Sequence, residues 1–404
     1  MRPEEIESGG HDPYFESASR ALKQARLARP TLLLDLDRLD TNLNRFTASL
    51  REGLGYRIVV KSLPSMPLVA HIMEQANTNR LMVFHQPFLN HLAETFPNSD
   101  ILLGKPFPVE AAARFYDYLR PGGFDPSQQL QWLIDTPQRL IEYQALAQAR
   151  GLNLRICVEI DVGLHRGGLK DPADLDSMLT MMARDPKLSF GGLMGYDAHV
   201  AKLPTTLGWR AREFKAVIER YSAFVETARR HDPMRPVQDL TLNAGGSPTF
   251  HLHNEIAMAN EVSVGSALVK PSDFDLDSLA AFDPAIFIAT PVIKAFGKTE
   301  IPGLPYLGDV MGWYDKNRAK SFFIYGGYWK ANPVSPPGLR PNSLYGHSSN
   351  QELLNGPASV TLKPNDYVFL RPTQSEAVML QFGDLAIMRQ GTIVDAWPVL
   401  QQGN

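Results

Sequence analysis

The feature that most constrains the fold of this chain is a repeated alternation of short apolar β-type runs with amphipathic helix-like segments. The apolar runs lack the clean alternation of a half-buried strand, so they predict a parallel sheet covered on both faces. Their expected ranges are Thr31–Leu36, Arg57–Val60, Arg80–Phe84, Asp100–Leu103, Leu130–Ile134, Leu154–Ile160, Ser189–Met194, Asp239–Leu242 and Glu261–Val264. This α/β pattern is enough to close a (β/α)₈ barrel of the TIM type, with one strand to spare.

The chain changes character after about Phe274. Short alternating strands and many prolines follow, which predicts a separate C-terminal antiparallel β domain. The expected strands are Ile286–Val292, Ser321–Gly326, Ala358–Leu362, Asp366–Leu370, Ala386–Arg389 and Thr392–Trp397. The proline-rich stretch from Ala331 to Gly346 is expected to be a long loop, serving as a lid or a dimer arm.

Charge and composition narrow the class of protein. A net charge of -3 without a Lys/Arg block argues against nucleic acid as a partner. No apolar run is long enough to cross a membrane, and the start Met1–Glu5 is polar and acidic, unlike a signal peptide. The single cysteine, Cys157, lies in an apolar strand and is expected in the core. The sequence therefore predicts a cytoplasmic protein.

Lys61 ends one of the predicted strands. A lysine in a crowded site of low dielectric constant loses its charge more easily, and a neutral amine can attack an aldehyde to form a Schiff base. The alternative is a solvated lysine that closes a strand. Lys61 is one of several polar groups at strand ends, where parallel barrels carry their catalytic groups; the others include His85, Lys105, Asp135, Asp161, Tyr196, His199 and Asn243.

Two glycine-containing segments follow later strands. Asn243 to Thr249 reads Asn-Ala-Gly-Gly-Ser-Pro-Thr, and backbone N–H groups at its glycines, with the hydroxyls of Ser247 and Thr249, would suit a phosphate. The alternative is a tight strand-to-helix turn. Glu159 to Gly168 places Arg166 after an acidic strand end; this arginine either faces a cofactor ring nitrogen or forms a salt bridge with Glu159 or Asp161.

Four motifs in this order carry a resemblance: Val60-Lys61-Ser62, Glu159 to Arg166, Gly192 to His199, and Ala244 to Ser247. Together they resemble the D-threonine aldolase and D-serine dehydratase family of pyridoxal-phosphate enzymes, which share the alanine racemase-like fold (fold type III). The resemblance extends from Pro30 to Asp384. It implies that the first strand joins the β domain, and it divides the chain into an N-terminal segment (1–37), a barrel (38–275) and a β domain (276–404).

The resemblance also implies roles for individual residues. Lys61 would be the Schiff-base lysine, Arg166 would face the pyridine nitrogen, and Tyr196 and His199 would lie near the cofactor. Cleavage of a C–C bond also needs a base for the β-hydroxyl proton, and His199 and a water on Glu376 are the candidates. The phosphate of pyridoxal 5'-phosphate would be held by the glycine segment and completed by a second turn; the expected cofactor-binding residues are Lys61, Arg166, Tyr196, Asn243, Gly245, Gly246, Ser247, Gly265 and Ser266.

The C-terminal metal motif departs from the family. Where the family places a histidine and a cysteine or aspartate, this chain has Gln374 and Glu376. Glutamine is a weak ligand, whereas Glu376 suits a weakly held Mg²⁺ or Mn²⁺. An acidic-histidine element is expected upstream, and the nearest stretch is His347 to Glu352. A zinc-dependent dehydratase is therefore not expected.

The resulting interpretation is a pyridoxal-phosphate-dependent lyase that cleaves a D-configured or β-hydroxy amino acid to a smaller amino acid and an aldehyde. The resemblance implies a homodimer with a small-molecule amino-acid substrate and no nucleic-acid or membrane partner. Three alternatives stay open: an amino-acid racemase, a deaminase of the D-serine dehydratase type, and a non-catalytic pyridoxal-phosphate-binding protein.

Overall fold

The structure is a computed structural model that describes residues 9–300, 303 and 307–402. The opening residues Met1–Glu5, which argued against a signal peptide, lie outside this description. The chain divides into two compact units. One comprises Met1–Asn42, Val269–Asp275 and Phe282–Val399, and the other comprises Leu43–Leu268, Leu276–Ala281 and Leu400–Asn404. The domain boundaries at residues 37 and 275 stay a prediction.

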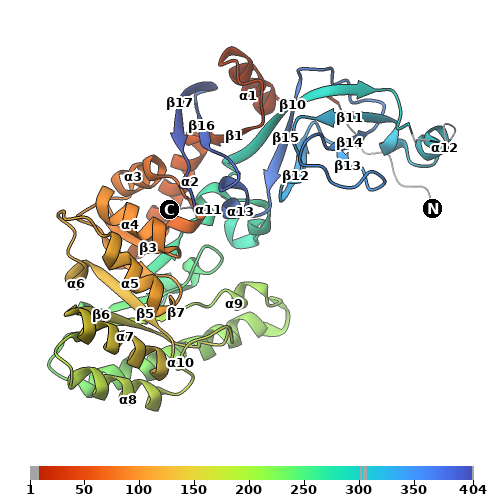
Figure 1. Ribbon diagram of the computed structural model, residues 1–404. Coiled ribbons are helices and arrows are strands. Elements are labelled where there is room, and N and C mark those ends of the chain that lie inside the picture. The colour runs from red at the N-terminus through yellow and green to blue at the C-terminus, as the bar shows by residue number, and fades with distance from the viewer. Residues whose placement is uncertain (1–8, 301–302, 304–306, 403–404) are drawn as a thin grey trace. The chain divides into compact units, whose positions relative to one another are not determined.

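The second unit is a closed barrel of eight parallel strands (Figure 1). They run in chain order, and each pairs with its sequence neighbour until the last pairs with the first: β2 (Gly55–Val59), β3 (Arg80–Val83), β4 (Asp100–Leu103), β5 (Leu130–Ile134), β6 (Leu154–Glu159), β7 (Leu188–Gly195), β8 (Thr241–Ala244) and β9 (Glu261–Val264). The predicted (β/α)₈ barrel is confirmed. The strand expected at Asp239–Leu242 begins two residues later, because Val237–Asp239 forms a 3₁₀ turn.

Helices alternate with these strands, as the apolar periodicity predicted. The longer ones are α3 (Met66–Gln75), α4 (Gln86–Thr95), α5 (Val109–Tyr118), α7 (Pro137–Arg150), α8 (Pro172–Ala183) and α10 (Trp209–His231). Side-chain caps begin several of them: the Thr136 hydroxyl accepts from the Arg139 amide, and the Asp171 carboxylate accepts from the Ala173 amide. These caps explain why α7 and α8 begin where they do.

A buried ion pair links barrel strands on the interior. The guanidinium of Arg57 on β2 lies 2.6 Å from the carboxylate of Glu261 on β9 and 2.7 Å from that of Asp100 on β4. Arg57 and Glu261 are almost fully buried, so each charge depends on the other for compensation. Cys157 on β6 is also buried, and burial raises the pKa of its thiol. The expectation of a core cysteine is confirmed.

The first unit holds a nine-stranded sheet ordered β13-β14-β11-β10-β1-β16-β17, with β15 and β12 attached through β10. Its strands are β1 (Thr31–Asp35), β10 (Ile286–Phe296), β11 (Lys320–Ile324), β12 (Ala331–Ser335), β13 (Arg340–Pro341), β14 (Leu353–Gly356), β15 (Tyr367–Pro372), β16 (Asp384–Arg389) and β17 (Thr392–Pro398). The spare strand β1 lies between β10 and β16, as the resemblance implied. Its pairing with β16 is parallel, so the sheet is mixed.

Two expectations for this sheet are wrong. Ala358–Leu362 is not a strand, because the pairing position beside β11 is taken by Leu353–Gly356. The stretch Ala331–Gly346 is not one long loop, because β12 pairs with β15 and β13 pairs with β14. Prolines misled the prediction here: β12 pairs on one side only, and an edge strand with a bulge after Pro333 tolerates a missing N–H.

An aromatic cluster fixes helix α1 (Pro13–Gln24) to this sheet. The ring of Phe15 on α1 lies 5.1 Å from that of Phe287 on β10 and 4.8 Å from that of Phe369 on β15. These side chains are buried with Leu22 and Leu33 in one cluster. The remaining helices are α2 (Leu36–Ser49), α6 (Pro126–Gln129), α9 (His199–Lys202), α11 (Ser266–Val269), α12 (Leu307–Tyr314) and α13 (Ser375–Met379).

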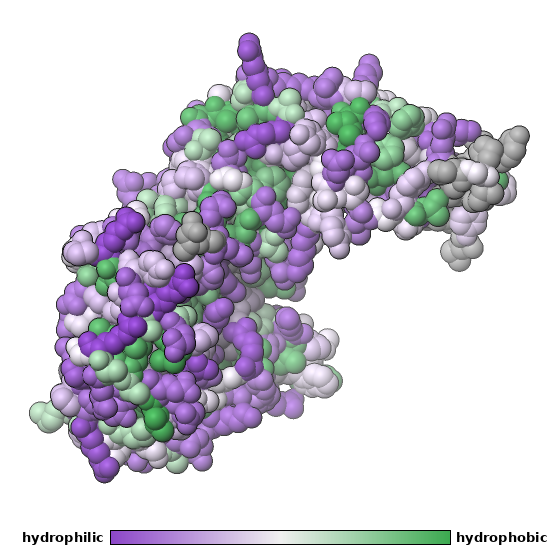
Figure 2. All heavy atoms as spheres, in the orientation of Figure 1, coloured by the Kyte–Doolittle hydropathy of each residue, from purple (hydrophilic) through white to green (hydrophobic). Residues whose placement is uncertain are grey.

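Hydrophilic residues cover much of the face drawn in Figure 2, with smaller hydrophobic areas between them. Within the described part of the chain, we find no helix that is both apolar enough and long enough to cross a bilayer.

Candidate functional site

Lys61 lies in a short 3₁₀ turn, Val60–Ser62, directly after β2. Its ammonium nitrogen is 4.7 Å from the ring centroid of Phe84, the residue that follows β3. The side chain is exposed, so the expectation that burial removes this lysine from water is wrong. The structure does place Lys61 at the carboxyl end of a barrel strand, the edge at which the other candidate residues also lie.

The glycine segment after β8 makes a tight turn. Gly245 has a φ of 67°, a conformation that favours glycine. A Cβ added at Gly246 would lie 2.5 Å from Cε2 of Tyr196, so the tyrosine ring rests directly on this backbone. The positive φ at Gly245 and the close contact with Tyr196 at Gly246 therefore both favour glycine over other residue types.

Ser247 joins this turn to the one after β9. Its buried hydroxyl accepts hydrogen bonds from the amide of Ala267 at 3.0 Å and from that of Gly265 at 3.4 Å. The hydroxyl of Ser266 donates to the hydroxyl of Ser62 at 2.9 Å, and Ser62 directly follows Lys61 in the sequence. Three segments that the sequence analysis singled out separately are thus connected by hydrogen bonds.

Arg166 lies close to Tyr196. The guanidinium carbon is 5.2 Å from the ring centroid of the tyrosine, a distance at which a cation interacts with the ring. Arg166, Tyr196 and Gly246 therefore form a continuous series of contacts across the ends of β6, β7 and β8.

Asp161 shapes the loop that carries Arg166. One carboxylate oxygen accepts from the amides of Gly163 and His165 at 3.0 Å each, and the other lies 2.8 Å from Nδ1 of His165. Burial opposes ionisation, but the hydrogen bonds from His165 and Gly163 outweigh it and lower the pKa of Asp161. Among the described residues Asp161 pairs with His165 rather than with Arg166, contrary to one alternative drawn from the sequence.

Glu159, at the end of β6, is a titratable group that the sequence analysis treated only as a partner for Arg166. Burial, reinforced by the negative charge of Asp135, raises the pKa of this carboxyl to about 7, although Arg166 opposes the change. A carboxyl of this kind can give or take a proton near neutral pH. An acidic residue at a barrel strand end was the signal in the sequence.

His199 begins the short helix α9. Its Nε2 lies 3.3 Å from a carboxylate oxygen of Glu213, which also accepts from Arg220 at 2.9 Å. Burial would raise the pKa of Glu213, but the hydrogen bonds from Arg220 and His199 lower it, so it stays ionised. Nδ1 of His199 is buried and finds no hydrogen-bond partner among the described residues.

Asn243 is engaged inside the barrel. Its amide nitrogen donates to Glu261 at 2.8 Å and to Ser263 at 2.7 Å, both on β9. Both hydrogen bonds from the Asn243 amide thus belong to the interior network that includes Arg57 and Glu261. This arrangement gives Asn243 a role in joining β8 to β9.

A buried triad that sequence reasoning missed supports the glycine turn. The carboxylate of Asp197 accepts from the hydroxyl of Thr249 at 2.6 Å and lies 2.8 Å from Nε2 of His253. The Thr249 hydroxyl also accepts from the amide of Gly246. The expectation that Thr249 offers its proton to a phosphate is wrong, because that proton goes to Asp197. Nothing in the sequence links His253 to this turn, since it comes from a later 3₁₀ segment, Phe250–Asn254.

The candidate metal residues lie in the sheet unit. The Gln374 side-chain oxygen accepts from the ammonium of Lys330 at 2.7 Å, and Ser375 donates to Glu376 at 3.4 Å. His347 lies 2.6 Å from Glu352. Within residues 9–300, 303 and 307–402, no group of three or more His, Cys, Asp or Glu side chains converges as a metal site would require.

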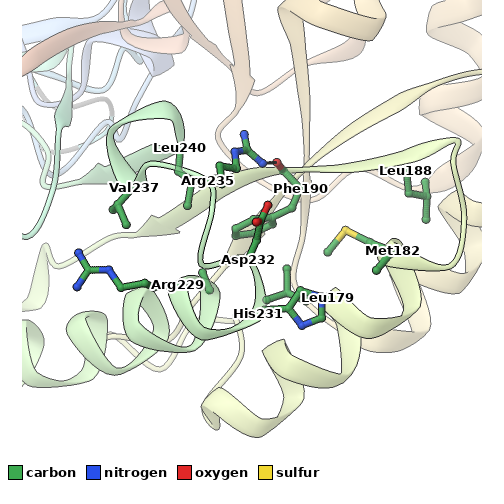
Figure 3. A pocket seen from close by; sticks show the side chains of 12 residues that line it. Leu179, Met182, Leu188, Phe190, Arg229, His231, Asp232, Arg235, Val237 and Leu240 are labelled. Carbon is green, nitrogen blue, oxygen red and sulfur yellow. Dashed lines mark hydrogen bonds between the residues drawn. The ribbon is translucent and has the colours of Figure 1, made fainter.

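Figure 3 shows a cavity of about 170 Å³ at the amino ends of β7 and β8, the end away from Lys61. Leu179, Met182 and Phe190 supply apolar walls, and Arg235 donates to the carbonyl of Phe190 at 2.6 Å. Arg235 is thus already used to join two barrel segments. We interpret this cavity as a packing gap between α8, α10 and the barrel.

Comparison with known proteins agrees with this geometry. Residues 34–273 match the family described as alanine racemase, N-terminal domain. This chain belongs to that family. The chain is also 29% identical over 157 residues to a D-threonine aldolase of Arthrobacter sp, covering 37% of this chain and 39% of that protein. It is 22% identical over 281 residues to a 3-hydroxy-D-aspartate aldolase of Paracoccus denitrificans, covering 67% and 66%.

Solved structures show the same fold. A D-threonine aldolase from Filomicrobium marinum matches with a TM-score of 0.70 at 16% identity, covering 91% of this chain and 94% of the other. An alanine racemase from Clostridium difficile 630 matches with a TM-score of 0.66 at 14% identity, covering 91% and 98%. The resemblance to the aldolase and racemase group, and the fold that it implied, are confirmed. The curated relatives are matched over less than two thirds of their own lengths.

Proposed function

We propose that this protein is a pyridoxal-phosphate-dependent lyase that cleaves a D-configured β-hydroxy amino acid to a smaller amino acid and an aldehyde. One observation carries the proposal: the hydrogen bonds through Ser247 and Ser266 join both glycine turns to the segment of Lys61. The names of the two curated relatives, D-threonine aldolase and 3-hydroxy-D-aspartate aldolase, support the reaction class.

The residues at the barrel end suit the cofactor. A phosphate needs backbone N–H groups that it can approach closely, and Gly245 and Gly246 carry no side chain to prevent this, although the Gly246 amide donates to the Thr249 hydroxyl in this structure. Gly265 and Ser266 would supply the second wall, Lys61 would bind the aldehyde carbon, and Arg166 would face the ring nitrogen. When bound, the cofactor supplies an electron sink for the carbanion.

The protein residues would manage protons and charge. A guanidinium does not give up its proton, so Arg166 would keep the ring nitrogen unprotonated. Tyr196 holds Arg166 from one side while resting on Gly246. Both contacts favour one orientation of the arginine.

His199 is the proposed base for the β-hydroxyl proton. If its Nε2–H donates to Glu213, the lone pair is on Nδ1, the atom without a partner among the described residues. In the overall reaction the Cα–Cβ bond breaks, the hydroxyl oxygen becomes the aldehyde carbonyl as its proton leaves, and Cα gains a proton. Nδ1 of His199 would accept the first of these protons.

Racemisation is a second candidate, favoured by Glu159. A racemase needs two acid/base groups, and a buried carboxyl with a pKa of about 7 is a suitable partner for Lys61. Elimination of the D-serine dehydratase type, and binding without catalysis, are the remaining alternatives.

We also propose a cytoplasmic homodimer with at most a weakly held Mg²⁺ or Mn²⁺ at Glu376. The dimer follows from the family resemblance alone. The metal proposal is supported by the oxygen donors of Gln374 and Glu376, although the ammonium of Lys330 already contacts Gln374.

Product analysis tests the reaction. The purified protein with pyridoxal phosphate is incubated with D- and L-β-hydroxy amino acids, with and without Mg²⁺, Mn²⁺ or Zn²⁺. An aldehyde and glycine support the lyase; inverted substrate supports the racemase; a 2-oxo acid and ammonia support the dehydratase. If the cofactor binds but no product forms, the protein binds pyridoxal phosphate without catalysis.

A further inference from the structure

A second cavity lies beside Lys61, at the carboxyl ends of β3 and β4. Its volume is about 390 Å³, and its walls include Phe84, His85, Lys105, Phe107, Arg114 and Gln402. The function proposed above has no role for it. Phe84 lines this cavity and also contacts Lys61, whose ammonium nitrogen lies 4.7 Å from the centroid of the Phe84 ring. A group held near Lys61 can therefore extend into this cavity past one aromatic ring.

The charge of the cavity is of one sign. Lys105 and Arg114 line it, and no aspartate or glutamate does. Among the described residues, neither cation forms an ion pair with a carboxylate; the guanidinium of Arg114 lies 5.1 Å from the ring of Tyr118. Both residues are exposed, and two cations that line one cavity without a carboxylate there favour an anion as its ligand.

His85 adds a neutral hydrogen-bonding group. Burial, followed by the nearby positive charge of Lys105, lowers the pKa of His85. Its Nδ1 is buried without a hydrogen-bond partner among the described residues. An oxygen of a bound ligand would satisfy this atom.

The apolar part of the wall sets the size of the ligand. Phe84 and Phe107 line the cavity together with the two cations, and the Phe84 ring also contacts Lys61. At about 30 Å³ for a water-sized group, the cavity has room for on the order of ten non-hydrogen atoms. That number of atoms corresponds to an aromatic ring with a terminal group. It exceeds the number that a single carboxylate would occupy.

We propose that this cavity is a specificity pocket for substrates whose side chain is ring-sized and ends in a carboxylate. The proposal rests on the function proposed above, because it assumes that the amino-acid end of the substrate is held at Lys61. Phe84 and Phe107 contact the ring, and Lys105 and Arg114 bind the carboxylate. The reaction then releases glycine and a carboxylated aromatic aldehyde.

A matched pair of substrates tests the pocket. D-configured 4-carboxyphenylserine and 4-carbamoylphenylserine have nearly the same shape and differ in charge. Charge-assisted hydrogen bonds predict a kcat/KM for glycine release at least about tenfold higher with the carboxylate, mainly through KM. Equal values for the two substrates would overturn the pocket and leave the lyase intact.

Two variants locate the effect. Lys105→Met and Arg114→Met should each remove most of the preference for the carboxylate, because kcat/KM should fall much more for the carboxylate substrate than for the carbamoyl substrate. Lys215→Met is the matched control, because Lys215 is exposed on α10 and outside the cavity. A preference that survives both pocket variants would show that the carboxylate is bound elsewhere.

Binding separates the pocket from the reaction. Calorimetry with 4-(hydroxymethyl)benzoate and with 4-(hydroxymethyl)benzamide should give a Kd at least about fivefold lower for the benzoate, and Lys105→Met should abolish this difference. This measurement needs no turnover. If neither substrate is cleaved but the benzoate binds preferentially, the lyase fails and the pocket stands; equal binding of both probes overturns the pocket.

Discussion

The barrel end and the sheet unit both contain clusters of polar side chains, but the clusters are built differently. Around the glycine turn, Asp197, Thr249 and His253 are fully buried, and Asp197 binds Thr249 and His253 from 52 and 56 residues earlier in the chain. In the sheet unit, His347 and Glu352 are five residues apart, and His347 is largely exposed. The groups of a fully buried network depend strongly on one another, whereas a pair with one exposed partner contributes less to stability; the buried member of this pair, Glu352, also accepts from the amide of Tyr328.

This contrast explains where function is expected. The barrel end has hydrogen bonds that hold two glycine turns against the segment of Lys61, so small changes there should have large effects. In the sheet unit, Gln374 accepts from Lys330, and Glu376 accepts from Ser375 at 3.4 Å, the length of a weak hydrogen bond. The following predictions test this difference, beginning with the largest expected effect.

Lys61→Ala should abolish turnover, with a loss of at least about a thousandfold, because no other group can take its place as nucleophile. Borohydride reduction should attach the cofactor to Lys61 in the wild type, as seen by peptide mass spectrometry, and to no residue in the variant. The fold should persist, since the side chain is exposed. An adduct on Lys105 or Lys330 would contradict the assignment.

Asp197→Ala should destabilise the barrel by about 3 kcal/mol, because it leaves Thr249 and His253 buried without their acceptor. Urea unfolding measures this change, and cofactor affinity should fall with it. Asp176→Ala is the control, since that aspartate is exposed on α8 and should change stability by less than about 0.5 kcal/mol. Similar losses in both variants would remove the distinction between buried and surface clusters.

Arg166→Glu should alter the products more than the stability. A carboxyl in this position permits a protonated ring nitrogen, so transamination should rise by about tenfold relative to the main reaction. The ratio of 2-oxo acid to aldehyde measures the change. If this variant keeps both its cofactor affinity and its product ratio, Arg166 has only a structural role.

Glu159→Gln should flatten the dependence of stability on pH. Its folded pKa of about 7 lies above the ordinary value of 4.5 for a glutamate, so the folded state binds more protons between these values. Stability should therefore be highest below the unfolded pKa and fall as pH rises toward 7, by on the order of 2 kcal/mol. Urea titrations from pH 4.5 to 7.5 measure this slope. Glu219→Gln, exposed on α10, should leave the slope unchanged.

Chelation should have the smallest effect. Oxygen donors at Gln374 and Glu376 favour a hard, weakly held ion, so treatment with a chelator should change the rate of aldehyde release by less than about twofold. Elemental analysis should find no tightly bound zinc. About one zinc per chain, together with chelator-sensitive release of ammonia from D-serine, would restore the dehydratase.

The sequence predicted the barrel better than the sheet. Eight buried parallel strands leave a strong local signal, since each is a short apolar run followed by a helix. Strands such as Ala331–Ser335 carry prolines that an edge position permits, and only the pairing with β15 reveals them. Lys61, Arg166 and the glycine turn could be singled out as candidates because strand ends and glycine spacing are visible locally. His253 and Glu213 were not, because their partners are 56 and 14 residues away.

The position of β1 has a consequence for the order of folding. This strand is made early, yet it lies between β10 and β16 in the sheet, and its partner Leu385 follows Leu32 by roughly 350 residues. During synthesis, all eight barrel strands emerge before β10 and long before β16. The first strand must therefore wait unpaired while the barrel forms, and the nine-stranded sheet closes only near the end of translation.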